Sequence, residues 1–207
     1  MFSQFNKVDT IDKLQKVNIE YIKGKTNTIP HNDCPMNEYS NLKKSVLVKL
    51  NKKGFITFNG RNYLNEMSFK KEEEYDFGIW TFWQQKPYIT GYIQTEKLKN
   101  IINTIDKNIN YVFINKDNKR ISNSEKKIFY SRCRQSLFRN RNNEQKWYGY
   151  TFDSVSLFSN YNVIIEFIGV NKKLEEKLYN DYSYVEFSYK KYNFNFDIGN
   201  YILNLIK

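Results

Sequence analysis

The chain of 207 residues contains no alanine, and it has only 8 glycines, 3 prolines, 2 cysteines and 1 histidine. Asparagine, lysine, isoleucine, phenylalanine and tyrosine are abundant instead. Because the codons of these residues are rich in A and T, we infer an AT-rich source genome, such as that of a large DNA virus, a phage or a protist. The same codon bias is a competing explanation for the excess of lysine, and it weakens asparagine as a turn signal.

The scarcity of cysteine and histidine limits the chemistry that the chain can perform. Cys34 and Cys133 are isolated in the sequence, which indicates reduced thiols rather than a disulfide framework. A structural zinc site usually needs four nitrogen or sulfur ligands, so we expect no metal. The common phosphate-binding, dinucleotide-binding and nucleophile-elbow motifs are also absent, and we expect no cofactor.

The chain also lacks the signals that would direct it to a membrane or out of the cell. No run of 18 apolar residues is present, so we expect no membrane span. The first ten residues lack the basic segment and apolar core of a secretory signal. We therefore expect a cytoplasmic protein that is not secreted, located in the host cytoplasm or the virion if it is viral.

Length and pattern together predict an α+β fold. The chain is long enough for one substantial domain, and its helical and strand patterns mix without a regular β-α-β alternation. We expect a single compact domain over residues 1–207, with 147–207 as a candidate C-terminal subdomain. About five helices are predicted, and apolar residues at helical spacing place the main ones at 9–23, 39–51, 96–106, 172–178 and 198–206.

The stretch from Asp76 to Ile93 is expected to be the centre of a mixed or antiparallel sheet. It contains Trp80 and Trp83, and aromatic and β-branched residues dominate both of its halves. The polar residues 84–87 separate these halves, which predicts a central hairpin over 77–93. Residues 65–75 are read as a charged loop, and a second hairpin is expected from 184–189 and 192–196.

The segment 119–146 carries the strongest charge signal in a chain with a formal net charge of +11. Four of the six arginines fall within 132–141, and a helix over about 123–141 would place Arg132 with Arg139 and Arg134 with Arg141. Phe129, Tyr130 and Phe138 interleave with them, a mixture that suits phosphate contacts and base stacking. The candidate nucleic-acid-binding residues are Lys126, Lys127, Arg132, Arg134, Arg139 and Arg141. The competing interpretation is a solvated helix face from a lysine- and arginine-rich genome.

A second candidate site is the loop that contains the single histidine. His31, Asp33 and Cys34 place an imidazole, a carboxylate and a thiol within four residues. A base and nucleophile pair is one interpretation of this grouping. The other is a loop in which Asp33 forms a turn and Cys34 packs as a small apolar residue.

Part of the chain resembles an uncharacterised domain family of bacterial and phage proteins. The resemblance covers residues 29–93 and rests on IPHNDCP, SVLVKLNKKGFITF and WQQKPYITGYI. The matching positions are His31, Leu50, Asn51, Gly54, Phe55, Thr57, Gln85 and Gly91. The Ser-Gln-Pro-Gly turn that usually follows the threonine in that family is Phe58-Asn59-Gly60-Arg61 here. The resemblance implies a compact α+β core and no activity, and it suggests that His31, Thr57 and Gln85 come together.

Three classes of function therefore remain open. The first is a basic binding protein that contacts the phosphates of DNA or RNA through the arginine-rich helix. The second is a small enzyme or nucleotide-binding protein with a polar pocket at His31, Asp33, Cys34, Thr57 and Gln85. The third is a structural or interaction protein that binds a protein partner through its aromatic surface.

Overall fold

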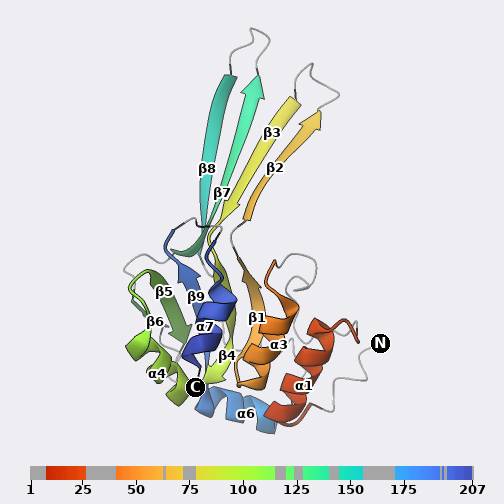
Figure 1. Cartoon of the computed structure of the whole chain (residues 1–207), viewed down its shortest axis with the longest axis vertical. Coiled ribbons are helices and arrows are strands. Elements are labelled where there is room, and N and C mark those ends of the chain that lie inside the picture. The colour runs from red at the N-terminus through yellow and green to blue at the C-terminus, as the bar shows by residue number, and fades with distance from the viewer. Residues whose placement is uncertain are drawn as a thin grey trace.

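Two antiparallel sheets and five helices make up the part of the chain that the structure describes. The structure is a computed structural model, and it describes residues 8–26, 41–62, 64–71, 78–114, 120–123, 128–139, 145–155, 171–191, 193 and 195–206. One sheet has five strands and forms the body of the molecule with the helices, and the other has four strands and projects from it (Figure 1). The predicted α+β fold is confirmed.

The five-stranded sheet has the strand order β1-β4-β9-β5-β6. Its strands, in chain order, are β1 (Ile56–Arg61), β4 (Tyr88–Gln94), β5 (Ile109–Ile114), β6 (Arg120–Ser122) and β9 (Tyr182–Tyr189). The last strand in the chain thus lies in the middle, paired with β4 on one side and β5 on the other. Residues that are far apart in the sequence therefore have to meet before this sheet is complete.

Five helices cover this sheet, and their positions agree with the apolar periodicity of the sequence. They are α1 (Ile11–Ile22), α3 (Lys44–Lys52), α4 (Thr95–Thr104), α6 (Lys172–Asp181) and α7 (Ile198–Leu205). Thr10 caps α1 by accepting a hydrogen bond from the amide of Lys13, and Asn171 caps α6 in the same way. The helices predicted from the sequence at these five places are confirmed.

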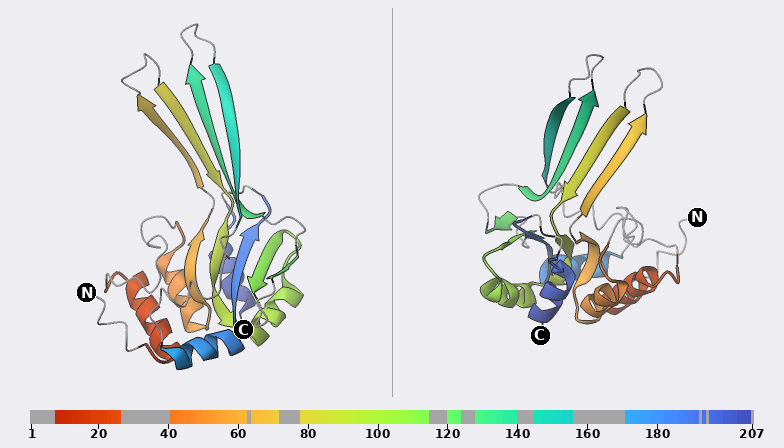
Figure 2. Two further views of the ribbon diagram at one scale, coloured as in Figure 1. Left: turned by 180° about the vertical axis from the view of Figure 1, so that it is seen from behind. Right: turned by 45° about the horizontal axis from the view of Figure 1, so that its top comes forward.

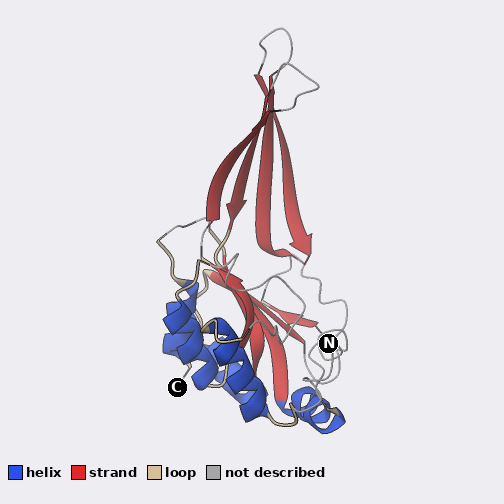
Figure 3. Ribbon diagram, turned by 90° about the vertical axis from the view of Figure 1, so that its right-hand side faces the viewer, coloured by secondary structure: helices blue, strands red, loops and turns tan. Residues whose placement is uncertain are grey.

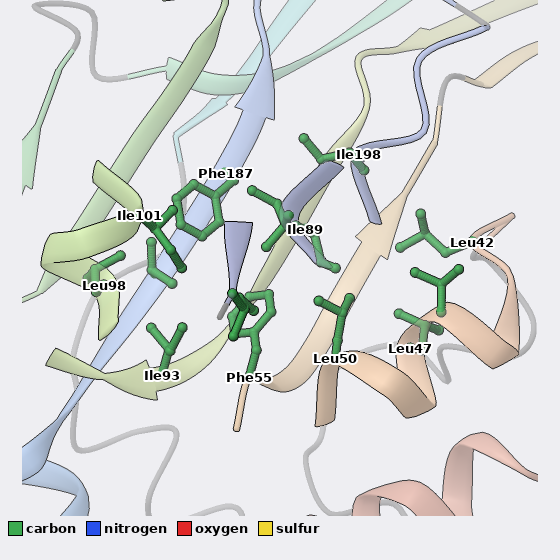
Figure 4. Close-up of a cluster of buried hydrophobic side chains, with 14 of the residues drawn as sticks. Leu42, Leu47, Leu50, Phe55, Ile89, Ile93, Leu98, Ile101, Phe187 and Ile198 are labelled. Carbon is green, nitrogen blue, oxygen red and sulfur yellow. The ribbon is translucent and has the colours of Figure 1, made fainter. Parts of the chain in front are cut away.

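The helices divide the hydrophobic core into two layers. On one face of the sheet, side chains of α3, α4 and α7 pack against Ile89, Ile93 and Phe187 (Figure 4). On the other face, α6 and the start of α1 pack against Ile56 and Tyr92. Because β4 has helices on both sides, its residues from Tyr88 to Ile93 are all buried.

The four-stranded sheet extends away from this body. Its strand order is β2-β3-β7-β8, and the strands are β2 (Leu64–Lys71), β3 (Gly78–Gln85), β7 (Ile128–Arg139) and β8 (Gln145–Val155). Two views from other sides show the same projection (Figure 2). Figure 3 shows the described helices gathered beside the five-stranded sheet, and none of them lies against the four-stranded one.

The predicted hairpin over 77–93 is wrong, although both of its halves are strands. β3 and β4 belong to different sheets, and Lys86 and Pro87 join them. Pro87 has no N–H to give to a ladder, so it interrupts pairing without reversing the chain. The hairpin instead pairs β1 with β4 in the body sheet and β2 with β3 in the projecting sheet.

This long hairpin keeps one register across its interruption. Arg61 is opposite Tyr88 in the first sheet, and Leu64 is opposite Gln85 in the second. Each arm advances by three residues between these two pairs, so the register is unchanged. The charged loop expected at 65–75 is therefore also wrong over residues 65–71, which form most of β2.

The second predicted hairpin, from 184–189 and 192–196, is wrong as well. β9 is already paired on both sides, so no edge remains for a returning strand. The described residues 193 and 195–197 are not in a strand. Phe196 instead stacks on Tyr189, with ring centroids 3.9 Å apart.

Within the described residues, no helix has both the length and the apolar character needed to cross a bilayer.

We expect Gly91→Ala to destabilise the body sheet severely. A Cβ atom at Gly91 would lie 2.3 Å from the carbonyl oxygen of Ile56 and 2.9 Å from the ring of Phe55. A backbone carbonyl in a paired strand cannot move aside, so the free energy of unfolding should fall by about 3 kcal/mol or more. Urea unfolding followed by circular dichroism measures this change.

Gly24→Ala is the matched control. Gly24 has a φ of 71°, but nothing lies within 4 Å of an added Cβ, so only the backbone conformation is penalised. That penalty is about 1 kcal/mol. An equal loss in the two variants would contradict the close approach of β1 and β4 at Gly91.

Candidate functional site

The four-stranded sheet gathers aromatic and basic residues on a part of the molecule that the described helices leave uncovered. All three tryptophans of the chain, Trp80, Trp83 and Trp147, lie in its strands. The other aromatic residues in these strands are Phe69, Phe82, Phe129, Tyr130, Phe138, Tyr148, Tyr150 and Phe152. Such residues are enriched in binding surfaces, so this sheet is the first candidate for the functional site.

Positive charge dominates the same four strands. Their basic residues are Lys70, Lys71, Arg132, Arg134, Arg139 and Lys146, and their acidic residues are Glu66 and Asp153. Three of the six arginines in the chain therefore lie on β7, a strand in the interior of the sheet. A ligand that matches this balance would carry negative charge.

The strand register places the arginines of β7 in rows with aromatic residues. Arg134 is opposite Trp83 on β3 and Tyr150 on β8. Arg132 is opposite Gln85 and Phe152, two positions nearer the body. Directly opposite residues in an antiparallel pair have Cβ atoms only about 5 Å apart, so each row brings different residue types together across three strands.

The helix predicted over 123–141 is wrong, because residues 128–139 form β7. The pairing of Arg132 with Arg139 and of Arg134 with Arg141 rested on two turns of a helix and has no counterpart in a strand. Lys126, Lys127 and Arg141 lie outside the described residues. Of the six predicted nucleic-acid-binding residues, the structure thus places three, and it places them on one strand.

The second predicted site can be followed only in part. His31, Asp33 and Cys34 lie outside the described residues. Thr57 lies in β1 of the body sheet, opposite Gly91, whereas Gln85 ends β3 of the projecting sheet. The structure therefore assigns Thr57 and Gln85 to different sheets. Within the described part of the chain, no group of three or more His, Cys, Asp or Glu side chains could hold a metal ion.

Thr57 takes part in a buried hydrogen-bond network that joins three elements. The side chain of Asn51 donates to the carbonyl of Leu47 and to the hydroxyl of Thr57, at 2.8 Å each. Its amide oxygen accepts from the side chain of Asn18 at 2.8 Å and from the amide of Thr57 at 3.3 Å. Asn51 therefore uses both amide hydrogens and both lone pairs to tie α1, α3 and β1 together.

Four residues of the motifs at 45–58 and 83–93 have structural roles in the body. Gly54 ends α3 with a φ of 94°, a conformation that favours glycine. Asn51 and Thr57 form the network, and Gly91 allows the close approach of β1 and β4.

A buried polar layer on the body sheet was missed by sequence reasoning. Thr90 and Glu186 are opposite each other on β4 and β9, and both are buried. Ser188 is fully buried in the next row, between Tyr88 and Asn110. The available signal was the alternation of polar and apolar residues in SYVEFSY, which predicts one polar face for that strand.

Comparison with known proteins gives no family assignment: no family model matches the chain, and no curated protein matches it significantly.

We expect Asn51→Leu to destabilise the protein by about 2–4 kcal/mol, because Asn18 and the Thr57 amide would lose a buried partner. Thr57→Val removes one hydroxyl and should cost about 1 kcal/mol. Urea unfolding compares the two variants. If Thr57 instead served a ligand site, Thr57→Val would abolish ligand binding while leaving stability unchanged.

Proposed function

We propose that this protein binds nucleic acid through its four-stranded sheet, with the arginines of β7 contacting phosphates. The observation that supports this most directly is the concentration of arginine and tryptophan in one projecting sheet that no described helix covers. Both chemical features of a nucleic acid, its charged backbone and its flat bases, have a counterpart in these strands.

The charge supports a phosphate ligand for two reasons. Arginine presents a planar fork of donors that matches phosphate oxygens better than the single ammonium of lysine does. Arg132 and Arg134 are two residues apart on β7, so they share one face of the sheet and lie about 7 Å apart at the usual rise per residue. These two arginines can contact neighbouring phosphates of one nucleic-acid strand, whereas Arg139, at an odd spacing from both, lies on the opposite face.

The aromatic residues support a role for the bases. A base that stacks on an aromatic side chain contributes about 1–3 kcal/mol, and this contribution depends little on base identity. The face that carries Arg132 and Arg134 also carries Trp83 on β3, Phe138 on β7, and Tyr150 and Phe152 on β8. A sheet with aromatic positions in successive strands is a common platform for single-stranded ligands.

The uncovered sheet is less easily explained as part of a core. Aromatic residues in a sheet are usually buried by a second layer, as they are in the body, where Phe58, Tyr92 and Tyr184 pack together. Codon bias explains the abundance of lysine and tyrosine, but it does not explain why tryptophan and arginine gather in the same strands.

We expect the triple variant Arg132→Gln, Arg134→Gln, Arg139→Gln to weaken binding of a single-stranded oligonucleotide by at least about tenfold. Each lost phosphate contact should also reduce the slope of log K against log salt by about 0.7. Fluorescence anisotropy with a labelled RNA or DNA of about 20 nucleotides, titrated at several salt concentrations, measures both quantities.

The control variant is Lys23→Gln, Lys49→Gln, Lys172→Gln, which removes the same charge from exposed positions on the body helices and their ends. It should retain nearly all of the affinity. Equal losses in the two variants would show that net charge alone drives binding. If the unaltered protein binds neither DNA nor RNA at low salt, the proposal is wrong.

A further inference from the structure

A hollow of about 260 Å³ lies at the end of the body that is remote from the projecting sheet. It is bordered by the first turn of α1, the end of α3, the start of α4 and the start of β9. β4 enters the body beside the projection at Tyr88 and reaches this hollow at Gln94, which is opposite Tyr182. None of these residues belongs to the four-stranded sheet.

Three lysines dominate the lining of the hollow. Lys52 and Lys53 come from the end of α3, and Lys97 comes from the first turn of α4. Asp12 is the acidic residue in the same lining, so positive charge is in excess. Uncharged polar groups complete it, namely Gln15, Gln94 and Tyr182. This combination offers hydrogen-bond donors and positive charge to one small volume.

Two of the lysines are held in place by backbone carbonyls. Lys97 Nζ donates to the carbonyl of Lys53 at 3.1 Å, and Lys53 Nζ donates to the carbonyl of Ile206. An ammonium group has three hydrogens, so each of these lysines retains further donor capacity. Fixing a long side chain before the ligand arrives reduces the entropy that binding would otherwise lose.

Tyr182 is kept in its neutral form. Burial raises the pKa of its hydroxyl above the ordinary value of 10.0, and the negative charges of Asp181 and Asp12 add to this, against a hydrogen bond with Gln94. The hydroxyl is therefore neutral at physiological pH, as in an ordinary tyrosine, and it can donate a hydrogen bond.

We propose that this hollow binds a small phosphate-class anion, either inorganic phosphate or the phosphate group of a small metabolite. The ammonium groups of Lys52 and Lys97 supply charge-assisted hydrogen bonds to the phosphate oxygens, and Gln15, Gln94 and Tyr182 supply neutral partners. The site is separate from the proposed nucleic-acid surface, and its existence does not depend on that function.

Isothermal titration calorimetry tests the site with two probes, inorganic phosphate and adenosine 5′-monophosphate, at matched ionic strength. We expect saturable binding with one site per chain. Lys52→Gln together with Lys97→Gln should weaken it by at least about tenfold. Tighter binding of adenosine 5′-monophosphate than of phosphate would identify a metabolite, and equal binding would identify the free anion.

Two further variants keep the outcome unambiguous. The side chain of Lys52 makes no hydrogen bond to another described residue, so Lys52→Gln alone should weaken binding without affecting stability. Lys23→Gln with Lys172→Gln removes two exposed charges elsewhere on the body and should change the affinity by less than about twofold. The proposal is wrong if neither probe binds at millimolar concentration, or if this control loses as much affinity as the Lys52 and Lys97 variant.

Nucleic-acid binding separates the two proposals. Lys52→Gln should leave oligonucleotide affinity unchanged, and the triple arginine variant of β7 should leave phosphate binding unchanged. Loss of both activities in either variant would overturn the assignment of two independent sites.

Discussion

The register shared by the two sheets is the constraint on which the molecule depends. The arms of the long hairpin pair in the body, lose their ladder for two residues each, and pair again in the projection without a shift. A shift of one residue on either side would exchange the two faces of that strand. The pairing of β1 with β4 in the body therefore continues into the pairing of β2 with β3 in the projecting sheet. Arg134 is opposite Trp83 through a further pairing, that of β7 with β3.

Most of the body could be predicted from the sequence because its helices have strong local signals. α3 has apolar residues at helical spacing and ends at a glycine, and α1 has a threonine cap and a buried stripe that includes Leu14 and Tyr21. These signals act within a few residues, so they need no knowledge of the rest of the chain. The central position of β9 had no such signal, since its partners are about 75 and 95 residues away in the sequence.

The error at β7 has a simple physical origin. Phe129, Cys133 and Leu137 are spaced by four residues, which places them on one side of a helix. Four is also an even number, so the same residues share one face of a strand. Periodicity could not separate a helix from a strand here. A helix would have placed Arg132 beside Arg139, whereas the strand places Arg132 opposite Gln85 and Phe152. At Pro87 the ambiguity was different, because a missing N–H marks an interruption in pairing but does not say whether the chain reverses. The candidate site was thus predictable in composition and not in geometry.

The length of the projecting sheet can change independently of the packing of the body. The strands of this sheet pair as β2 with β3 and β7 with β8, while the two hydrophobic layers found among the described residues belong to the body. Adding two residues to both arms of a hairpin would lengthen it by about 7 Å and preserve the facing of every residue nearer the body. The projecting sheet could therefore become longer or shorter in steps of two residues per strand while the body keeps its sequence and packing.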